Sequence, residues 1–245
     1  MKPTERFTGR AGAYAAGRPA YPPAAIDALL EGLGNPRELL AVDLGAGTGI
    51  SSRLLADRGV AVLAVEPNAS MRDAAEAHPR VTFVDATAED TGVGEAEADL
   101  VVAFQAFHWF DERAALDEMV RILRPGGRAA VVYNERDESD PVTREFGTIV
   151  RKYATDDAEA LRARMPDTFT AFPAWQHKSI RTFPHAYTLD RDGLRARVES
   201  TSYLPNGGPA GEALFAEIDA FAAAHPDGFT MRMLAIVASG DAGAG

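Results

Sequence analysis

Asp43-Leu44-Gly45-Ala46-Gly47-Thr48-Gly49 is the stretch that decides the fold, because it joins an apolar run over 39–44 to a helix-compatible segment over 50–58. Glycines at such a junction lack the Cβ atoms that would block close approach of the backbone to a ligand. A dinucleotide-binding fingerprint, G-x-G-x-x-G, would need glycine at position 50, where Ile50 stands. The segment therefore predicts a strand, a ligand-binding loop and a helix. Its glycine spacing, D-x-G-x-G-x-G, differs from that of the dinucleotide-binding fingerprint.

Outward from this loop, apolar runs and helical segments continue to alternate. Further apolar runs cover 60–65, 81–84, 99–104 and 128–133, and further helical segments cover 69–77 and 111–123. Asp111 is suited to cap the helix that follows it, and Pro125-Gly126-Gly127 is suited to end it. Apolar runs without alternation are typical of strands that are covered on both faces. We therefore expect a parallel sheet with helices on both sides.

The pattern changes after residue 134. Residues 135–176 are polar and helix-compatible, with expected breaks at Pro141, Pro166 and Pro173. Late strands are expected over 179–189 and 228–239, and helices over 192–199 and 209–224. We expect a single α/β domain, 1–245, with a Rossmann-like doubly wound sheet of seven strands, mostly parallel with an antiparallel edge. The insertion 135–176 is expected to form part of the substrate pocket.

Charge and composition argue against several classes of protein. The chain carries 25 Lys and Arg against 36 Asp and Glu, a formal net charge of −11, so no global positive field attracts nucleic acid or anionic lipid. It has no cysteine, which fits a reducing compartment. Neither a signal peptide nor a membrane-spanning apolar stretch is expected from the sequence. We expect a cytoplasmic protein without nucleic-acid or membrane partners, and the sequence leaves its oligomeric state open.

Glu66 closes the second expected strand, 23 residues after Asp43. A carboxylate at this place accepts two hydrogen bonds from a ribose diol. The glycine loop and this acid together predict a nucleoside-containing ligand.

Three segments resemble motifs of the class I S-adenosylmethionine-dependent methyltransferases: VDLGAGTGISSRLLADRGVAVLAVEPNASM (42–71), DLVVAFQAFHWFD (99–111) and ILRPGGRAAVVY (122–133). The resemblance covers about residues 39–134. The segment 14–22, YAAGRPAYP, is similar to a subgroup of small-molecule methyltransferases related to trans-aconitate methyltransferase. The resemblance implies S-adenosyl-L-methionine as cofactor and a small molecule as methyl acceptor.

The same resemblance implies a set of cofactor-binding residues along the methionine, ribose and adenine portions of the cofactor. Arg18 would meet the methionine carboxylate through its bidentate guanidinium group. Thr87 stands where many relatives carry the Asp of an Asp-Ala pair, which puts the contact with the adenine amino group in question. The implied residues are Arg18, Asp43, Gly45, Ala46, Gly47, Gly49, Glu66, Pro67, Met71, Thr87, Ala88, Glu89, Gln105 and Ala106.

The segment 105–110 follows the fourth expected strand, and ligands of open α/β sheets sit beyond the carboxyl ends of strands. Methyl transfer from a sulfonium is an in-line displacement that gains mainly from positioning, so a dedicated catalytic residue is not required. His108 is the candidate catalytic base, because an imidazole titrates near neutrality; a role in fixing the loop is the alternative. The expected acceptor-binding residues are Tyr14, Tyr21, His108 and Trp109.

Two further expectations concern the N-terminal segment and metals. Residues 1–24 are expected to form a lid over the cofactor crevice, with the aromatic side chains of 7–22 covering an apolar face of the cofactor. The histidines show no H-E-x-x-H helix, and the acidic clusters are typical of solvated loops, so no metal is expected.

Three other functions stay open. An NAD-dependent oxidoreductase shares the strand, glycine loop and ribose acid but would need the third glycine of its fingerprint. A nucleic-acid methyltransferase that modifies amino groups would carry an Asn/Asp-Pro-Pro-aromatic tetrad where this chain reads FQAFHWF. A non-catalytic nucleoside-binding module would keep the pocket without turnover, because fold does not fix function.

Overall fold

The computed structural model describes residues 21–201 and 203–243. Its centre is a seven-stranded sheet with the strand order β3-β2-β1-β4-β5-β7-β6. Strands β1 to β5 run parallel, and β7 pairs antiparallel with both β5 and β6 at one edge. The prediction of a seven-stranded α/β sheet, mostly parallel with an antiparallel edge, is confirmed.

The parallel half alternates strands and helices from residue 40 onward as the sequence predicts, and a helix over 23–30 that was not predicted precedes it. Its strands are β1 (Leu40–Leu44), β2 (Ala61–Val65), β3 (Val81–Val84), β4 (Ala98–Phe104) and β5 (Leu123–Arg136). Its helices are α2 (Pro23–Leu30), α3 (Ile50–Ala56), α4 (Ala69–Asp73) and α5 (Glu112–Ile122), with short 3-10 turns η2 (Pro36–Glu38) and η3 (Phe107–Trp109). Asp111 caps α5 as predicted, because its side chain accepts a hydrogen bond from the backbone N–H of Ala114.

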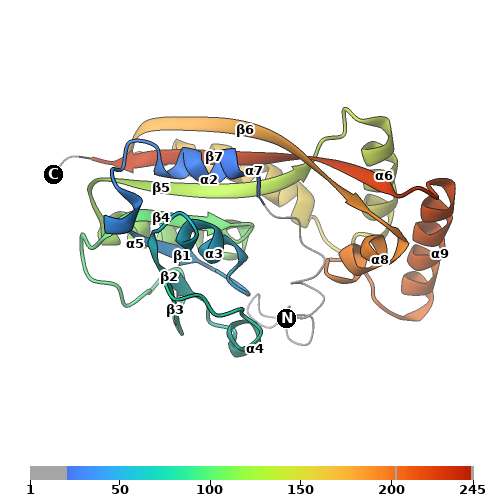
Figure 1. The fold of residues 1–245 in the computed structure, drawn as a ribbon, viewed down its shortest axis with the longest axis horizontal. Helices are drawn as coiled ribbons and strands as arrows, with labels where there is room; N and C mark the ends of the chain where they lie inside the picture. Colours follow the sequence, from blue (N-terminus) through green and yellow to red (C-terminus); the bar gives the residue numbers. More distant parts are fainter. Residues whose placement is uncertain (1–20, 202, 244–245) are drawn as a thin grey trace.

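The C-terminal half consists of α6 (Pro141–Tyr153), α7 (Ala158–Ala171), β6 (Trp175–Leu189), α8 (Arg191–Glu199), α9 (Gly208–Ala224) and β7 (Phe229–Ala242). Strands β6 and β7 are much longer than β1 to β3, and they pair with each other along most of their length, with one irregularity between Gln176 and Ser179. They extend beyond the parallel strands toward a second lobe formed by α6, α8 and α9, which we call the cap (Figure 1).

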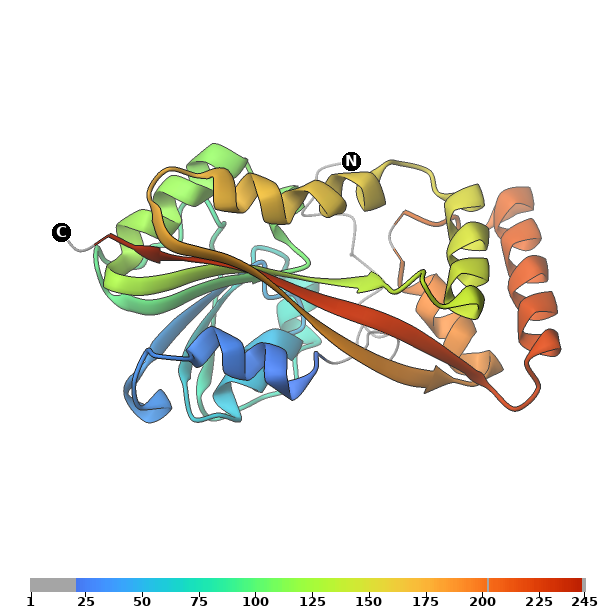
Figure 2. The same cartoon turned by 90° about the horizontal axis from the view of Figure 1, so that it is seen from above.

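Separate hydrophobic clusters cover the two faces of the sheet. One cluster packs α5 and α7 against one face, and the other packs α2 and α3 against the opposite face. Figure 2 shows these two pairs of helices on opposite sides of the strands. A third cluster joins the cap helices to one another and to the first residues of β7. The cap thus has its own small core but shares its longest strands with the main sheet.

The predicted break at Pro166 is wrong, because this residue lies inside α7. Proline in a helix interior costs about 3 kcal/mol through a lost hydrogen bond and a steric clash. Here Met165, Pro166 and Phe169 are buried, and their packing outweighs that cost. Pro141 begins α6, where the missing N–H is not needed, and Pro173 follows the end of α7, so these two predicted boundaries are confirmed.

Two other boundaries differ from the sequence prediction. Strand β5 starts at Leu123, which pairs with Ala98, while Arg128 pairs with Leu100, so the Pro-Gly-Gly turn lies within the strand as an irregularity. Helix α4 ends at Asp73, four residues early, because Met71 alone is buried and too few apolar contacts support a longer helix. Among helices of the described residues, none has the length and apolar character needed to cross a membrane.

Candidate functional site

The glycine loop after β1 has a backbone conformation that suits glycine. Gly45 and Gly49 have φ angles of 66° and 74°, in the left-handed region. A Cβ atom at Gly45 would lie 2.8 Å from the Cβ of Ala106, and one at Gly49 would lie 2.8 Å from Phe83 Cζ. The loop therefore packs closely against the chain after β4 and against β3, and there is no room for side chains at these contacts.

Asp43 lies behind this loop and holds the start of α3. Its carboxylate is fully buried, and Oδ2 accepts hydrogen bonds from the hydroxyls of Ser51 and Ser52, each at 2.6 Å. Burial raises the pKa of Asp43 to about 6 despite these two hydrogen bonds, and the nearby Glu66 adds to the rise. Oδ1 has no hydrogen-bond partner among the described residues. The Asp43 carboxylate therefore fixes the end of the glycine loop through its hydrogen bonds to the start of α3.

Glu66, directly after β2, holds two backbone amides. Its Oε2 accepts a hydrogen bond from the N–H of Gly47 at 2.9 Å, and its Oε1 accepts one from the N–H of Asn68 at 2.8 Å. Burial raises the pKa of Glu66, and these two hydrogen bonds oppose the rise. Arg72 fixes the same residue by donating to its backbone carbonyl at 2.7 Å. A carboxylate has about four acceptor positions, so about two remain for the hydroxyls of a ligand.

An open cavity lies beside Glu66, with about 770 Å³ of empty space that includes solvent at its mouth, and we call it the Glu66 cavity. It lies where the carboxyl ends of β1, β2, β3 and β4 meet, which is the usual ligand position in a parallel sheet. Its lining residues are Gly45, Gly47, Glu66, Pro67, Asn68, Met71, Thr87, Ala88, Glu89, Phe104, Gln105, Ala106, Trp109 and Phe110. Ten of the residues predicted to bind a cofactor are among them, although they come from four separate stretches of sequence.

A second open cavity adjoins the first and shares Gly45, Phe104 and Gln105 with it; its empty space of about 520 Å³ also includes solvent at its mouth. We call it the Arg197 cavity. Its lining residues are Tyr21, Gly45, Ala46, Thr48, Ile50, Ser51, Phe104, Gln105, Asn134 and Arg197. Arg197 belongs to α8, so the cap and the main sheet both contribute to this cavity.

The turn after β4 borders both cavities, because Gln105 lines each of them. Gln105 has a φ of 53°, an uncommon conformation for a residue with a side chain, and its Nε2 donates to the backbone carbonyl of Asn134 at 2.8 Å. This hydrogen bond ties the turn to β5 and places Ala106 against Gly45. Strained backbone of this kind persists where the surroundings fix it, and such positions concentrate at functional sites.

His108 packs behind the cavity wall. It is only 8% exposed, its ring lies 4.4 Å from the Trp109 ring, and it is not among the lining residues of either cavity. The hydroxyl of Tyr133 accepts a hydrogen bond from the backbone N–H of His108 at 3.2 Å and lies 3.4 Å from its Nδ1. Burial raises the pKa of Tyr133 far above its ordinary value, so this phenol stays protonated. These contacts favour the role of His108 in fixing the turn.

The structure brings most, but not all, of the predicted site residues together. Tyr21 and Ala46 line the Arg197 cavity, and Trp109 lines the Glu66 cavity. Asp43 and Gly49 support the loop without lining either cavity. Arg18, Tyr14 and the predicted lid up to Ala20 lie outside the described residues.

Eight lining residues are absent from the sequence-based set: Thr48, Ile50, Ser51, Asn68, Phe104, Phe110, Asn134 and Arg197. The first six lie within two residues of a predicted site residue, whereas Asn134 and Arg197 lie elsewhere in the sequence. Asn134 directly follows the expected strand 128–133, which is a signal for a site residue, whereas Arg197 lies in a helix that also carries Arg191 and Arg195. Nothing in this local sequence distinguishes one of these arginines from the others. The described residues of 135–176 do not line either cavity, so the predicted role of this insertion in a substrate pocket stays a prediction.

No three His, Asp or Glu side chains of residues 21–201 and 203–243 gather in an arrangement that would hold a metal ion.

Comparison with known proteins places this fold and site in a family. A family model described as a methyltransferase domain matches residues 42–131. An uncharacterized methyltransferase of Mycobacterium tuberculosis is 41% identical over 167 residues, which cover 67% of this chain and 65% of that protein. A demethylmenaquinone methyltransferase of Mycolicibacterium vanbaalenii is 30% identical, and the match covers 66% of this chain and 67% of that protein.

A solved structure extends the match to most of the chain. A protein described as a type II methyltransferase from Anaeromyxobacter dehalogenans is 26% identical, with a TM-score of 0.69 over 91% of this chain and 97% of that protein. The chain belongs to the class I S-adenosylmethionine-dependent methyltransferases. The matched segment spans slightly less than two thirds of the mycobacterial relative.

Proposed function

We propose that this protein transfers the methyl group of S-adenosyl-L-methionine to a small-molecule acceptor. The observation that carries the proposal is the Glu66 cavity, where an acid, a glycine loop and the turn after β4 converge beside aromatic side chains. A nucleoside ligand needs a hydrogen-bond acceptor for its ribose and an apolar slot for its base, and this cavity offers both.

Named residues account for each portion of the nucleoside. Glu66 already accepts two backbone amides, and its remaining acceptor positions suit the two ribose hydroxyls. Met71 and Pro67 line the apolar part of the cavity beyond Glu66, where an adenine ring would find packing surface. Gly45 and Gly47 line the cavity without side chains, so a ligand can approach the loop backbone closely. The cofactor therefore fits the residues that are present.

Positioning is the main catalytic contribution that we assign to the chain. S-adenosyl-L-methionine supplies an electrophilic methyl group on a sulfonium, and its transfer requires the acceptor atom to be in line with the bond that breaks. The rigid turn over 105–110 suits this task, because Gln105 is tied to β5 and His108 is tied to Tyr133. Trp109 offers an aromatic face that attracts a positive charge. Water exclusion by this aromatic wall protects the reactive group.

A small acceptor is favoured by the net charge of the chain and by the name of one relative. The net charge of −11 disfavours the phosphate backbone of nucleic acids. The relative from Mycolicibacterium vanbaalenii carries the name of a demethylmenaquinone methyltransferase, so demethylmenaquinone belongs in an acceptor panel. trans-Aconitate belongs there too, because of the sequence similarity over 14–22.

Calorimetry with S-adenosylhomocysteine, with NADH as a matched control, tests the cofactor. We expect binding of S-adenosylhomocysteine and none of NADH, because the loop lacks the third glycine of the dinucleotide pattern. Transfer of labelled methyl groups from S-adenosyl-L-methionine into metabolite extracts, demethylmenaquinone and trans-aconitate then tests turnover. Binding without any transfer would favour the non-catalytic module, and tighter binding of NADH would favour the oxidoreductase.

A further inference from the structure

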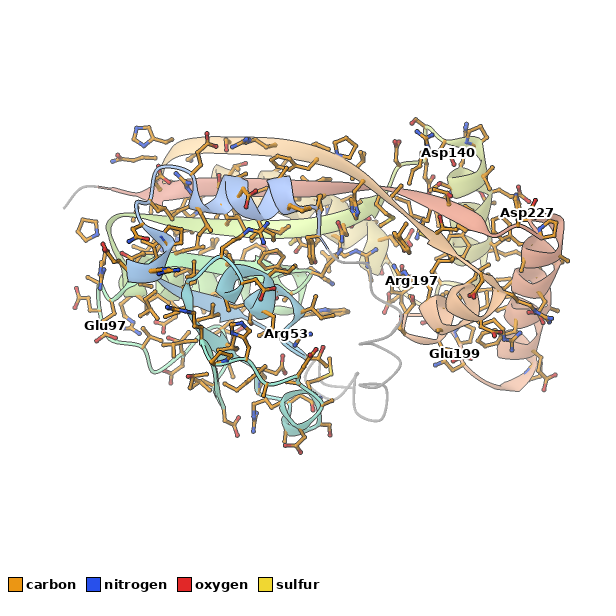
Figure 3. All side chains as sticks on the ribbon, in the orientation of Figure 1. Arg53, Glu97, Asp140, Arg197, Glu199 and Asp227 are labelled. Carbon is orange, nitrogen blue, oxygen red and sulfur yellow. The ribbon has the colours of Figure 1, made fainter. Side chains whose placement is uncertain are left out.

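Arg197 is a cation of the cap that faces the main sheet across a cavity. It lines the same cavity as Thr48 of the glycine loop and Asn134 of β5. Figure 3, which labels Arg197, shows it on the side of α8 that faces the main lobe. No other charged residue lines this cavity within the part of the chain that the structure describes.

The guanidinium group of Arg197 is short of hydrogen-bond partners. Its Nη1 donates to the hydroxyl of Thr201 at 3.2 Å, but its Nε is buried and has no partner among the described residues. The neighbouring Arg191 and Arg195 on the same helix instead form ion pairs with Asp219. A guanidinium has five donors, and a buried donor left unpaired is destabilising, so this arrangement suits an anionic ligand.

Thr48, on the wall of the Arg197 cavity opposite α8, is a second residue whose side chain indicates a ligand. Its hydroxyl is buried, and it also has no hydrogen-bond partner among the described residues. The carboxamide oxygen of Asn134 lies 3.0 Å from His185 Nε2, and since this oxygen only accepts, the amide nitrogen remains as a donor. Polar groups from three different elements thus converge on one cavity, and two of them lack partners.

The two adjoining cavities have opposite charge. The charged residues of the Glu66 cavity are Glu66 and Glu89, whereas the Arg197 cavity has only Arg197. A ligand with ribose hydroxyls at one end and a carboxylate at the other would match this polarity. S-adenosyl-L-methionine has this constitution, and its amino-acid portion would continue from Gly45 into the second cavity, because Gly45 lines both.

We propose that Arg197 binds a carboxylate in the Arg197 cavity, and that this group is the amino-acid carboxylate of the cofactor. The sequence resemblance assigns this carboxylate to Arg18, which lies outside the described residues, and two arginines can share one carboxylate because it has about four acceptor positions. The proposal rests on the proposed function, because it takes S-adenosyl-L-methionine as the ligand of the Glu66 cavity. An acceptor that carries a carboxylate offers the same chemistry, so the experiment has a separate arm for it. In either case the cap contributes directly to ligand binding.

The first arm compares S-adenosylhomocysteine with 5′-methylthioadenosine, which lacks the amino-acid portion. Calorimetry on Arg197→Met should show S-adenosylhomocysteine binding weakened about 10- to 150-fold, the range for a charge-assisted hydrogen bond, with 5′-methylthioadenosine unchanged. Arg197→Lys should lose less, since it keeps the charge but not the planar fork. Arg195→Met removes one charge from the same helix outside the cavity and should change neither affinity.

The second arm measures binding of succinate, as a carboxylate probe, to protein saturated with S-adenosylhomocysteine. If Arg197→Met leaves the affinity for S-adenosylhomocysteine unchanged but abolishes succinate binding, the carboxylate belongs to an acceptor and the assignment to the cofactor is overturned. If Arg197→Met changes neither, Arg197 binds no carboxylate. If the wild-type protein binds neither S-adenosylhomocysteine nor 5′-methylthioadenosine, the proposed function itself fails. Thermal unfolding of each variant checks that the fold is intact.

Discussion

Glu66 accepts a hydrogen bond from the backbone amide of Gly47 at 2.9 Å, so the acid at the end of β2 fixes the glycine loop at the end of β1. The same carboxylate also orients the start of the next segment through Asn68. One side chain therefore joins two neighbouring βα connections and lines the cavity between them. This arrangement gives Glu66 a structural contribution in addition to its proposed contact with ribose.

Glu66→Gln should weaken S-adenosylhomocysteine binding about 10- to 150-fold, because the charge-assisted hydrogen bonds become neutral ones and one oxygen becomes a donor. The change also places an amide N–H against the N–H of Gly47 or Asn68. Calorimetry measures the affinity, and Glu76→Gln, an exposed acid of the same connection, is the matched control. Unchanged affinity in a folded Glu66→Gln variant would remove Glu66 from the ribose site.

Gly45→Ala should destabilise the protein and abolish cofactor binding. The new Cβ would lie 2.8 Å from the Cβ of Ala106, and φ would have to stay at 66°. Gly92→Ala is the matched control, because its φ of 71° gives the same backbone strain of about 1–2 kcal/mol but no atom lies within 4 Å of the new Cβ. Thermal unfolding should therefore show a larger loss for Gly45→Ala. Equal losses would mean that the contact with Ala106 relaxes without cost.

Asp43 should make stability depend on pH between about 4 and 6. Its pKa is about 6 in the folded protein and near 3.8 when unperturbed, so the folded state binds the extra proton in this window. The contribution of Asp43 to the free energy of unfolding therefore falls as pH rises through the window, by roughly 3 kcal/mol.

Asp43→Asn should remove that part of the pH dependence, and the variant should be at least as stable as the wild type at pH 7. Urea unfolding at pH 4, 5, 6 and 7 measures the slope, and the exposed Asp73→Asn serves as control. An Asp43→Asn protein that keeps the wild-type slope would show that burial of this carboxylate does not govern its ionisation.

His108→Ala should keep detectable methyl transfer, with cofactor affinity within a few-fold of the wild type. An in-line displacement gains chiefly from alignment, whereas a general base contributes about 10²- to 10⁴-fold. Tyr133→Phe should have a comparable, modest effect, because it removes the hydroxyl that contacts His108. The pH profile of kcat/KM tests whether His108 acts as a general base. Loss of an acid limb near neutrality together with most of the rate in His108→Ala would identify His108 as a true base.

Sequence patterns predicted the parallel half of the fold well because its signals are local. Buried strands appear as short apolar runs, and the glycine loop marks the first strand-to-helix junction. Most of the residues around the Glu66 cavity were predicted from the resemblance to class I methyltransferases, and they lie in the segments that follow the predicted strands. Pro166 was misassigned because its cost is offset by burial of Met165 and Phe169 against the sheet, and such compensation depends on tertiary packing.

The position of Arg197 in a cavity could not be predicted from the sequence. Arg191, Arg195 and Arg197 occur within seven residues, and local patterns give them equal standing. Only the position of α8 across from the glycine loop, and the presence of Asp219 beside the other two, separates them. Both facts depend on contacts between segments distant in sequence. A similar limit applies to His108, whose contact with Tyr133 was not visible in the chain alone.

The strand order has a consequence for synthesis on the ribosome. Strand β6 joins the main sheet only through β7, which lies between β5 and β6 although it is made last of the three. While residues 190–228 emerge, β6 has no partner strand, and its backbone donors and acceptors are open to pairing with other chains. The sheet can be completed only after residues 229–242 have been synthesised. Arg197 can take its position opposite the glycine loop only then. Nascent chains stalled before residue 229 should therefore be the form most prone to aggregate.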